Sequence, residues 1–425
     1  MYTNSKLILC FALVPILSKP AFATTDPAWV ASSLEQALQR AEANNPELEA
    51  AIQRFNAARE QIRVASALPD PVLTFGHFVE PVQTRTGSQE QVYALKQSFP
   101  AWGMIGARRS AAQNVASAQQ YRYLGAVYAL RQKVTDAYAD AFYYEKACAA
   151  TRESLKLIRA MRAVAEEQVR TGASLNTMLR FELLAEKSKD DLALWVQKSE
   201  AAHSRLASLL NMDGAALGSV ANLDEASRDF AELSVMYARL RANNPELQAL
   251  RGESAAAGDR IRQNRLERYP NFTVGLNYID LDANASTAVD AGKDPWGVTL
   301  SVNLPLWQGK RNASVRAARA RQQALDARLR QRELELRAEL EAALSFYDTS
   351  HLRLRRYSER LIPLAEESLE HARNAYRTGL LGVLELLDSE QSLLDLRLRY
   401  WSALADTHRA SAKLISLTAS IPEIK

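Results

Sequence analysis

The chain has 425 residues, and its hydrophobic content of 47% and charged content of 24% exclude a disordered or low-complexity protein. Its 53 Lys and Arg against 49 Asp and Glu give a formal net charge of +4, which is small for this length. The basic residues alternate with acids, as in RQRELELRAELEAAL, so we interpret them as a solvated helix face and expect no nucleic-acid partner.

The first 23 residues are predicted to form a signal peptide for export. Lys6 supplies a basic start, residues 7–17 form an apolar core, and residues 21–23 (Ala-Phe-Ala) offer a cleavage site before Thr24. This apolar core is shorter than the roughly 20 residues that a membrane-spanning helix needs. A buried N-terminal helix is the alternative interpretation.

The rest of the chain contains an internal repeat. NNPEL begins at Asn44 and again at Asn243, an offset of 243 − 44 = 199. The triplet RTG, first found at Arg170, recurs 207 residues later. We interpret these matches as a tandem duplication, with repeats at 24–220 and 221–425.

Each repeat is predicted to run as helix, β-hairpin, long helix, corner and further helix. The first helical segments span roughly 33–67 and 227–268, and the hairpins about 71–99 and 270–304. The long helices are rich in Ala, Leu, Arg, Glu and Gln, and about 70 residues of helix extend about 100 Å. Apolar residues three and four apart favour coiled-coil packing, and Pro363 is expected to break or kink the last long helix.

The predicted strands alternate apolar and small polar residues. In PNFTVGLNYID and WGVTLSVNLP every second residue is apolar, so each strand has one apolar face. Both a sandwich with a dry core and a barrel with lipid outside and water inside produce this pattern. Trp296 and Tyr278 near the strand ends are typical of an interfacial girdle, whereas His77 and Gln97 interrupt the apolar register of the first repeat. Because small barrels begin at about eight strands, a barrel would need several copies of the chain.

In its motifs the chain resembles the TolC-type outer-membrane efflux channels, also called the outer-membrane factor family. The resemblance rests on NNPEL in both repeats, on FPAWG and LPLWQGKR after the strands, and on YRTGLLGVLELLDSEQSLL, and it covers about residues 30–420. It implies a mainly α fold with a β-barrel portion. A homotrimer would build one twelve-stranded β-barrel in outer-membrane lipid, continued by a twelve-helix α-barrel in the periplasm.

The same resemblance implies a passive outer-membrane exit duct of a tripartite efflux pump. Its partners would be a periplasmic adaptor (membrane fusion) protein and an inner-membrane transporter of the resistance–nodulation–division (RND) class. The short chain resembles the heavy-metal (CzcC-like) branch of the family, so the expected cargo is metal ions or small toxic compounds. The alternatives are the outer-membrane component of a type I protein secretion system and, from a different class, a periplasmic coiled-coil scaffold protein.

The sequence offers no catalytic constellation, so we expect neither an enzyme nor a cofactor. It lacks G-x-S-x-G, a phosphate-binding glycine loop and H-E-x-x-H. Cys10 falls in the predicted signal peptide, which leaves Cys148 without a disulfide partner and offers no N-terminal cysteine for acylation. We expect no metal site, because the five histidines are scattered: His77, His203, His351, His371 and His408.

Two acids, Glu385 and Asp388, follow the second RTG corner and share one helix face, one turn apart. The helix dipole favours acids in a first turn, and this alone could explain them. The family resemblance instead implies a pore aperture, where a trimer would present two rings of three carboxylates that favour cations. The equivalent residues 207 positions earlier are Met178 and Phe181, so a preference common to both corners does not explain the acids.

Both RTG corners are predicted helix–helix turns in which glycine takes the left-handed conformation. The family resemblance adds that these tips meet the adaptor protein. The candidate contact residues are Arg170, Thr171, Gly172, Arg377, Thr378 and Gly379.

Overall fold

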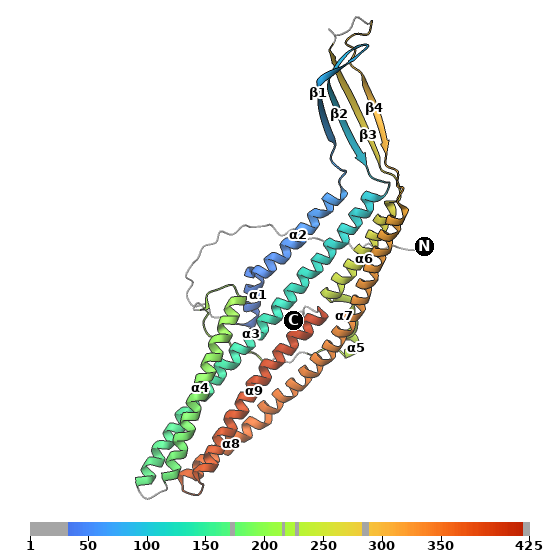
Figure 1. Cartoon of the computed structure of the whole chain (residues 1–425). Coiled ribbons are helices and arrows are strands. Elements are labelled where there is room, and N and C mark those ends of the chain that lie inside the picture. The colour runs from blue at the N-terminus through green and yellow to red at the C-terminus, as the bar shows by residue number, and fades with distance from the viewer. Residues whose placement is uncertain (1–32, 171–174, 215–216, 226–228, 283–288, 420–425) are drawn as a thin grey trace.

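The computed structural model is an elongated rod with a narrow β-sheet at one end and a long helical body (Figure 1). It describes residues 33–170, 175–214, 217–225, 229–282 and 289–419, so the predicted signal peptide lies outside the described residues. None of the helices in these ranges is long and apolar enough to cross a membrane.

The helical body is formed by nine helices in the described ranges, and they follow the predicted order in each half. The first half contains α1 (Leu34–Asn44), α2 (Pro46–Ser66), α3 (Met104–Arg170) and α4 (Leu175–Leu209). The second half contains α5 (Leu233–Asn243), α6 (Pro245–Leu266), α7 (Gln308–Arg356), α8 (Ile362–Arg377) and α9 (Val383–Thr418). A π-helical segment, Tyr357–Leu361, joins α7 to α8, so the regular α-helix is interrupted just before Pro363, where the sequence predicts a break or kink.

The predicted helical segments 33–67 and 227–268 each contain two helices, which meet at an Asn-Pro step. Asn45 and Asn244 are extended, with ψ of 121° and 122°, because a residue before proline is disfavoured in the helical region. Each proline then opens the next helix, where its missing N–H has no helical partner to lose.

These two asparagines also join distant helix ends. Oδ1 of Asn244 accepts from the N–H groups of Glu246 and Leu247, and Nδ2 donates to the Leu417 carbonyl at 2.9 Å. Asn45 repeats the arrangement, with Nδ2 donating to the Leu209 carbonyl at 3.2 Å. Each asparagine therefore caps one helix and holds the C-terminal turn of another, in the middle of the rod.

The sheet has four antiparallel strands in the order β1-β2-β3-β4: Val72–Thr84, Gly87–Phe99, Phe272–Asp282 and Trp296–Val302. Its register places Phe75 opposite Tyr93, Tyr93 opposite Tyr278, and Tyr278 opposite Trp296. Opposite residues of an antiparallel pair share a face, so one aromatic row crosses all four strands. This confirms the predicted apolar face, and Trp296 on it is 71% exposed.

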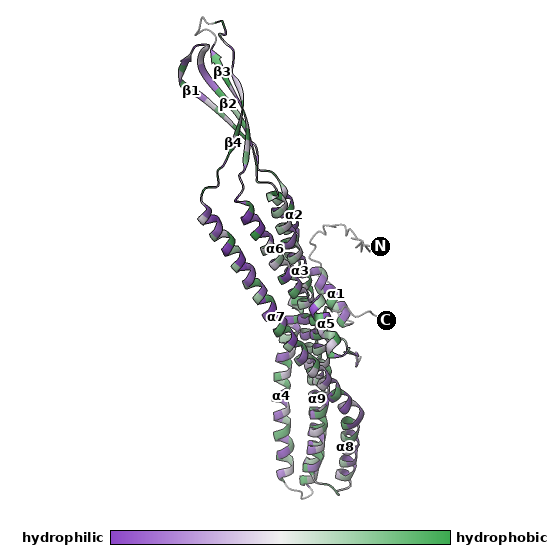
Figure 2. Ribbon diagram, turned by 90° about the vertical axis from the view of Figure 1, so that its right-hand side faces the viewer, coloured by the Kyte–Doolittle hydropathy of each residue, from purple (hydrophilic) through white to green (hydrophobic). Residues whose placement is uncertain are grey.

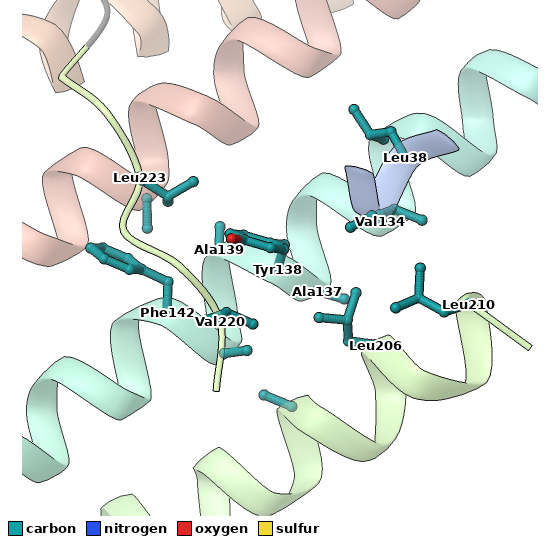
Figure 3. Close-up of a cluster of buried hydrophobic side chains, with 14 of the residues drawn as sticks. Leu38, Val134, Ala137, Tyr138, Ala139, Phe142, Leu206, Leu210, Val220 and Leu223 are labelled. Atoms are coloured by element: carbon teal, nitrogen blue, oxygen red, sulfur yellow. The ribbon is translucent and has the colours of Figure 1, made fainter. Parts of the chain in front are cut away.

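The mid-rod core surrounds Tyr138 of α3 (Figure 3). Leu206 of α4 and Leu210, the residue directly after α4, pack on it, as do Val220 and Leu223 of the extended segment that follows. The buried Tyr138 hydroxyl donates to the Ala221 carbonyl at 3.1 Å, and Glu145 accepts from the Val220 N–H, also at 3.1 Å. These two hydrogen bonds hold the segment against α3 in the middle of the rod.

Candidate functional site

The chain turns between α8 and α9 through a compact corner at the end of the rod farthest from the sheet (Figure 1). After Arg377 ends α8, Gly379 takes a φ of +75°, as predicted for this position. The N–H of Leu380 donates to the Ala375 carbonyl at 2.9 Å, and the Thr378 hydroxyl contacts two carbonyls of the last turn. The corner therefore satisfies the carbonyl groups that a helix end leaves without partners.

Glu385 lies in the first turn of α9, where its side chain folds back over the helix start. A Cβ added to Gly382, the N-cap residue, would lie 2.6 Å from Oε2 of Glu385. A carboxylate at this place is stabilised by the positive end of the helix dipole. The structure thus gives Glu385 a local role in α9, and that role is compatible with a second role toward solvent.

Glu385 and Asp388 are both exposed, while Leu386 between them is buried. Within the described residues neither acid has an ion-pair partner, although several exposed acids of the helical body do. The pair therefore forms a free acidic face near the tip, on the side of α9 turned away from its buried Leu386 and Leu393.

The position equivalent to Asp388 in the first half, Phe181, serves packing instead. Phe181 is fully buried in α4, among Leu155 and Ile158 of α3, and Val383 and Leu387 of α9 pack against this cluster. This cluster of α3 and α4 side chains thus supports the start of α9. An acid at position 181 would be buried in this cluster, which explains why only the second corner can carry the exposed pair.

The tip residues suggested for adaptor contact are exposed where the structure describes them. Arg170 at the end of α3 pairs only loosely, with Glu166 at 3.9 Å and Glu167 at 3.5 Å. Arg377, Thr378 and Gly379 are exposed at the other corner. Thr171 and Gly172 lie outside the described residues.

Sequence reasoning missed Glu390, a buried acid two residues beyond Asp388 and one turn beyond Leu386. Its side chain is 12% exposed, lies 3.5 Å from Arg373 of α8, and forms a hydrogen bond with Ser154 of α3. Burial raises the pKa of Glu390, and the Arg373 charge opposes this rise. Its position on the apolar line between Leu386 and Leu393 was the signal that could have identified it.

Over the described ranges, no three His, Cys, Asp or Glu side chains gather in a group that could hold a metal ion. His203 is the histidine with the most defined surroundings, since Nε2 lies 2.8 Å from Glu145 and Nδ1 lies 2.8 Å from the Ser199 carbonyl. Both ring nitrogens face oxygen atoms that can accept a hydrogen bond, an arrangement that favours the protonated ring. The Glu145 hydrogen bond accordingly raises the pKa of His203.

Comparison with known proteins places this geometry in a family. The model of the family described as "Outer membrane efflux protein" matches residues 37–211 and 236–420. The cobalt-zinc-cadmium resistance protein CzcC of Cupriavidus metallidurans is 23% identical over 388 residues, which cover 90% of this chain and 88% of that protein. The pyoverdine export outer membrane protein OpmQ of Pseudomonas putida is 23% identical over 419 residues, which cover 93% and 85%.

Solved structures share the fold. The outer membrane protein VceC of Vibrio cholerae superposes with a TM-score of 0.75 at 19% identity, covering 91% of this chain and 95% of that one. The rod, its terminal sheet and the order of its elements are therefore those of a known architecture.

Proposed function

Because the chain belongs to the outer membrane efflux protein family, we propose that it is the passive exit duct of a tripartite efflux pump. As in the family, its sheet lies in the outer membrane and its helices in the periplasm. In our proposal an inner-membrane RND transporter supplies the energy, and a periplasmic adaptor links that transporter to the duct. The cargo would be metal ions or small toxic compounds, a range in keeping with the names of the relatives CzcC and OpmQ.

The observation that carries this proposal is the open, one-sided sheet. Its apolar face is exposed, and neither β1 nor β4 has a further strand paired along its outer edge within the described residues. Open apolar edges are aggregation sites unless another strand covers them. In the proposal three copies join β4 to β1, which gives 3 × 4 = 12 strands with apolar side chains toward lipid.

The helical body supports the same assembly. In its lower half α4 packs on α3 and α8 packs on α9, so α4 and α8 form the two lateral edges. Large apolar side chains are exposed on both edges, namely Leu179 and Leu183 on α4 and Leu364 on α8. Contact between the α4 edge of one copy and the α8 edge of the next would cover these side chains.

We further propose that Glu385 and Asp388 line the narrowest part of the duct. Three copies would place six carboxylates around one opening, where they would attract cations and could bind a divalent ion. The packing of α9 on Phe181 supports this proposal, because it holds the helix from behind and leaves the acids free. The exposed tips, with Arg170 and Arg377–Gly379, are the proposed adaptor contacts.

The test is single-channel recording of the purified protein in a planar bilayer. The wild type should conduct with cation selectivity and be blocked by divalent cations. The double variant Glu385→Ala, Asp388→Ala should conduct more, select cations less and lose much of the divalent block. The matched control, Asp190→Ala with Asp191→Ala, removes two exposed acids of α4 that have no ion-pair partner among the described residues. No conductance in the wild type would refute the duct, and unchanged selectivity in the double variant would refute the aperture.

A further inference from the structure

The end of the helical body next to the sheet carries a concentrated positive charge. Two helices end there and two begin, within residues 57–71, 100–113, 257–271 and 303–317 (Figure 1). These ranges, which we call the collar, contain 11 Lys and Arg and 4 Asp and Glu, so their net charge is 11 − 4 = +7. The whole chain has only 53 − 49 = +4, so the remainder is slightly acidic. Folding thus gathers cations that are dispersed along the sequence.

Helix stability does not explain this charge. Helix starts favour acids, and α1, α2, α6 and α9 have an acid in their first turn, whereas α4, α5 and α8 have none there. The two helices that start in the collar, α3 and α7, have none, and Lys310 lies in the first turn of α7. The sheet-side part of α7 is also distinctly hydrophilic (Figure 2). A cation at a helix start is unfavourable, so an outside partner is the better explanation.

Internal pairing does not neutralise the collar either. Arg108, Arg109, Lys310 and Arg316 are exposed, and none has an ion-pair partner in the described part of the chain. Among the collar acids, Asp259 is already engaged, accepting from the Ser110 hydroxyl at 2.7 Å and from Asn114 at 2.8 Å. These four cations are therefore available to bind an anionic partner outside the chain.

An apolar belt separates these cations from the strands. Trp102 is 97% exposed and Trp307 is 76% exposed, and Leu304, Leu306 and Tyr269 beside them are exposed as well. Exposed tryptophan next to a transmembrane sheet is typical of the level of lipid headgroups. Long basic side chains just beyond such a belt can reach the phosphates while their stems cover apolar surface.

We propose that the collar binds the phosphate groups of anionic phospholipids at the periplasmic surface of the outer membrane. The belt sets the depth of the sheet in the bilayer, and the free cations select anionic headgroups around it. This inference rests on the membrane location of the proposed duct, but not on its cargo, its gate or its adaptor.

The test uses the purified full-length protein in bilayers that contain brominated phosphatidylglycerol or brominated phosphatidylcholine. Bromine in the acyl chains quenches tryptophan fluorescence, and Trp102 and Trp307 report from the belt itself. One cation near an anionic surface contributes about fivefold in binding, so we expect at least about a fivefold preference for phosphatidylglycerol. Salt at about 1 M should reduce this preference, because screening then acts within about 3 Å.

A collar variant should lose the preference while a remote variant with the same charge change keeps it. The collar variant combines Arg108→Gln, Arg109→Gln, Lys310→Gln and Arg316→Gln. The control combines Arg180→Gln, Lys187→Gln, Arg356→Gln and Arg360→Gln, all exposed on the helical body away from the sheet. Circular dichroism of both variants shows whether the helices are intact.

Equal binding of the two lipids by the wild type, or a preference that survives in the collar variant, overturns the proposal. So does an unchanged lipid preference with altered ion selectivity in single-channel recording, since the cations would then line the lumen. Absence of quenching by either lipid would instead contradict the membrane location. If the wild type does not conduct but still prefers phosphatidylglycerol, the proposed duct function is refuted and the lipid proposal stands.

Discussion

Replacing Asn244 tests the bond that ties the start of α6 to the end of α9. The side chain is 4% exposed, accepts from two N–H groups and donates to the Leu417 carbonyl at 2.9 Å. Loss of an N-cap side chain costs about 1 kcal/mol, and a buried carbonyl left without a partner costs about 1–3 kcal/mol. Asn244→Ala should therefore lower the free energy of unfolding by about 2–4 kcal/mol.

Two related variants separate the cap from the link. Asn244→Ser keeps a capping oxygen and loses the donor to Leu417, so it should cost about 1–3 kcal/mol. Asn45→Ala removes the equivalent residue, which has one cap bond and a longer link of 3.2 Å, and should cost less than Asn244→Ala. Hydrogen exchange at the starts of α2 and α6, with urea unfolding followed by circular dichroism, measures these differences. If Asn244→Ser is as stable as the wild type, the hydrogen bond to Leu417 does not stabilise the protein. If Asn45→Ala loses more stability than Asn244→Ala, the expected order of the two variants is wrong.

Three further predictions concern pH and assembly. The raised pKa of His203 means that its contribution is present below the ordinary histidine pKa of about 6.5 and is lost as pH rises through the folded value. The protection factor of the Val220 amide, which compares its exchange rate with the intrinsic rate at the same pH, should therefore fall as pH rises through the folded value, and His203→Gln should remove that fall. The raised pKa of Glu390 likewise means that the wild type loses stability as pH rises through the folded value, here at a lower pH. The melting temperature of Glu390→Gln should therefore rise relative to that of the wild type between pH 4 and 8. A relative fall would contradict this prediction. Leu183 is 73% exposed in the single chain, so Leu183→Glu should leave the helical content intact but weaken the proposed trimer by about 2–5 kcal/mol, through a charge buried between copies. Analytical ultracentrifugation in detergent decides this, and an unaltered trimer would exclude α4 from the interface.

Local sequence patterns predicted the elements whose structure depends on neighbouring residues in the chain. Alternation identified the strands and their apolar face, and the glycine of the second RTG triplet identified its corner. The division of the first helices was also encoded locally, because Asn-Pro is a strong cap-and-start signal. The division was missed because the helical pattern of apolar and charged residues is present on both sides of Asn-Pro.

Features that depend on distant parts of the chain were not predictable from local patterns. Phe181 is a core residue because α9 packs over it, so the reason that one corner is acidic and the other apolar appears only in three dimensions. Glu390 was missed because a single acid on an apolar line has no local signature of its partners on α3 and α8. The collar could not be predicted from local patterns for a similar reason, because its cations come from four separate helix ends.

The π-helical segment Tyr357–Leu361 has a consequence for how α7 and α8 pack. Each residue added to or removed from an α-helix turns everything beyond it by about 100°. Pro363 lacks the N–H that would bind the Glu359 carbonyl, so the wide turn before it is a place where an extra residue is already absorbed. Above it, α7 packs on both α6 and α9, while below it α8 packs on α9 through Leu369 and Tyr376. The segment therefore lets α7 and α8 keep separate packing phases within one helical run.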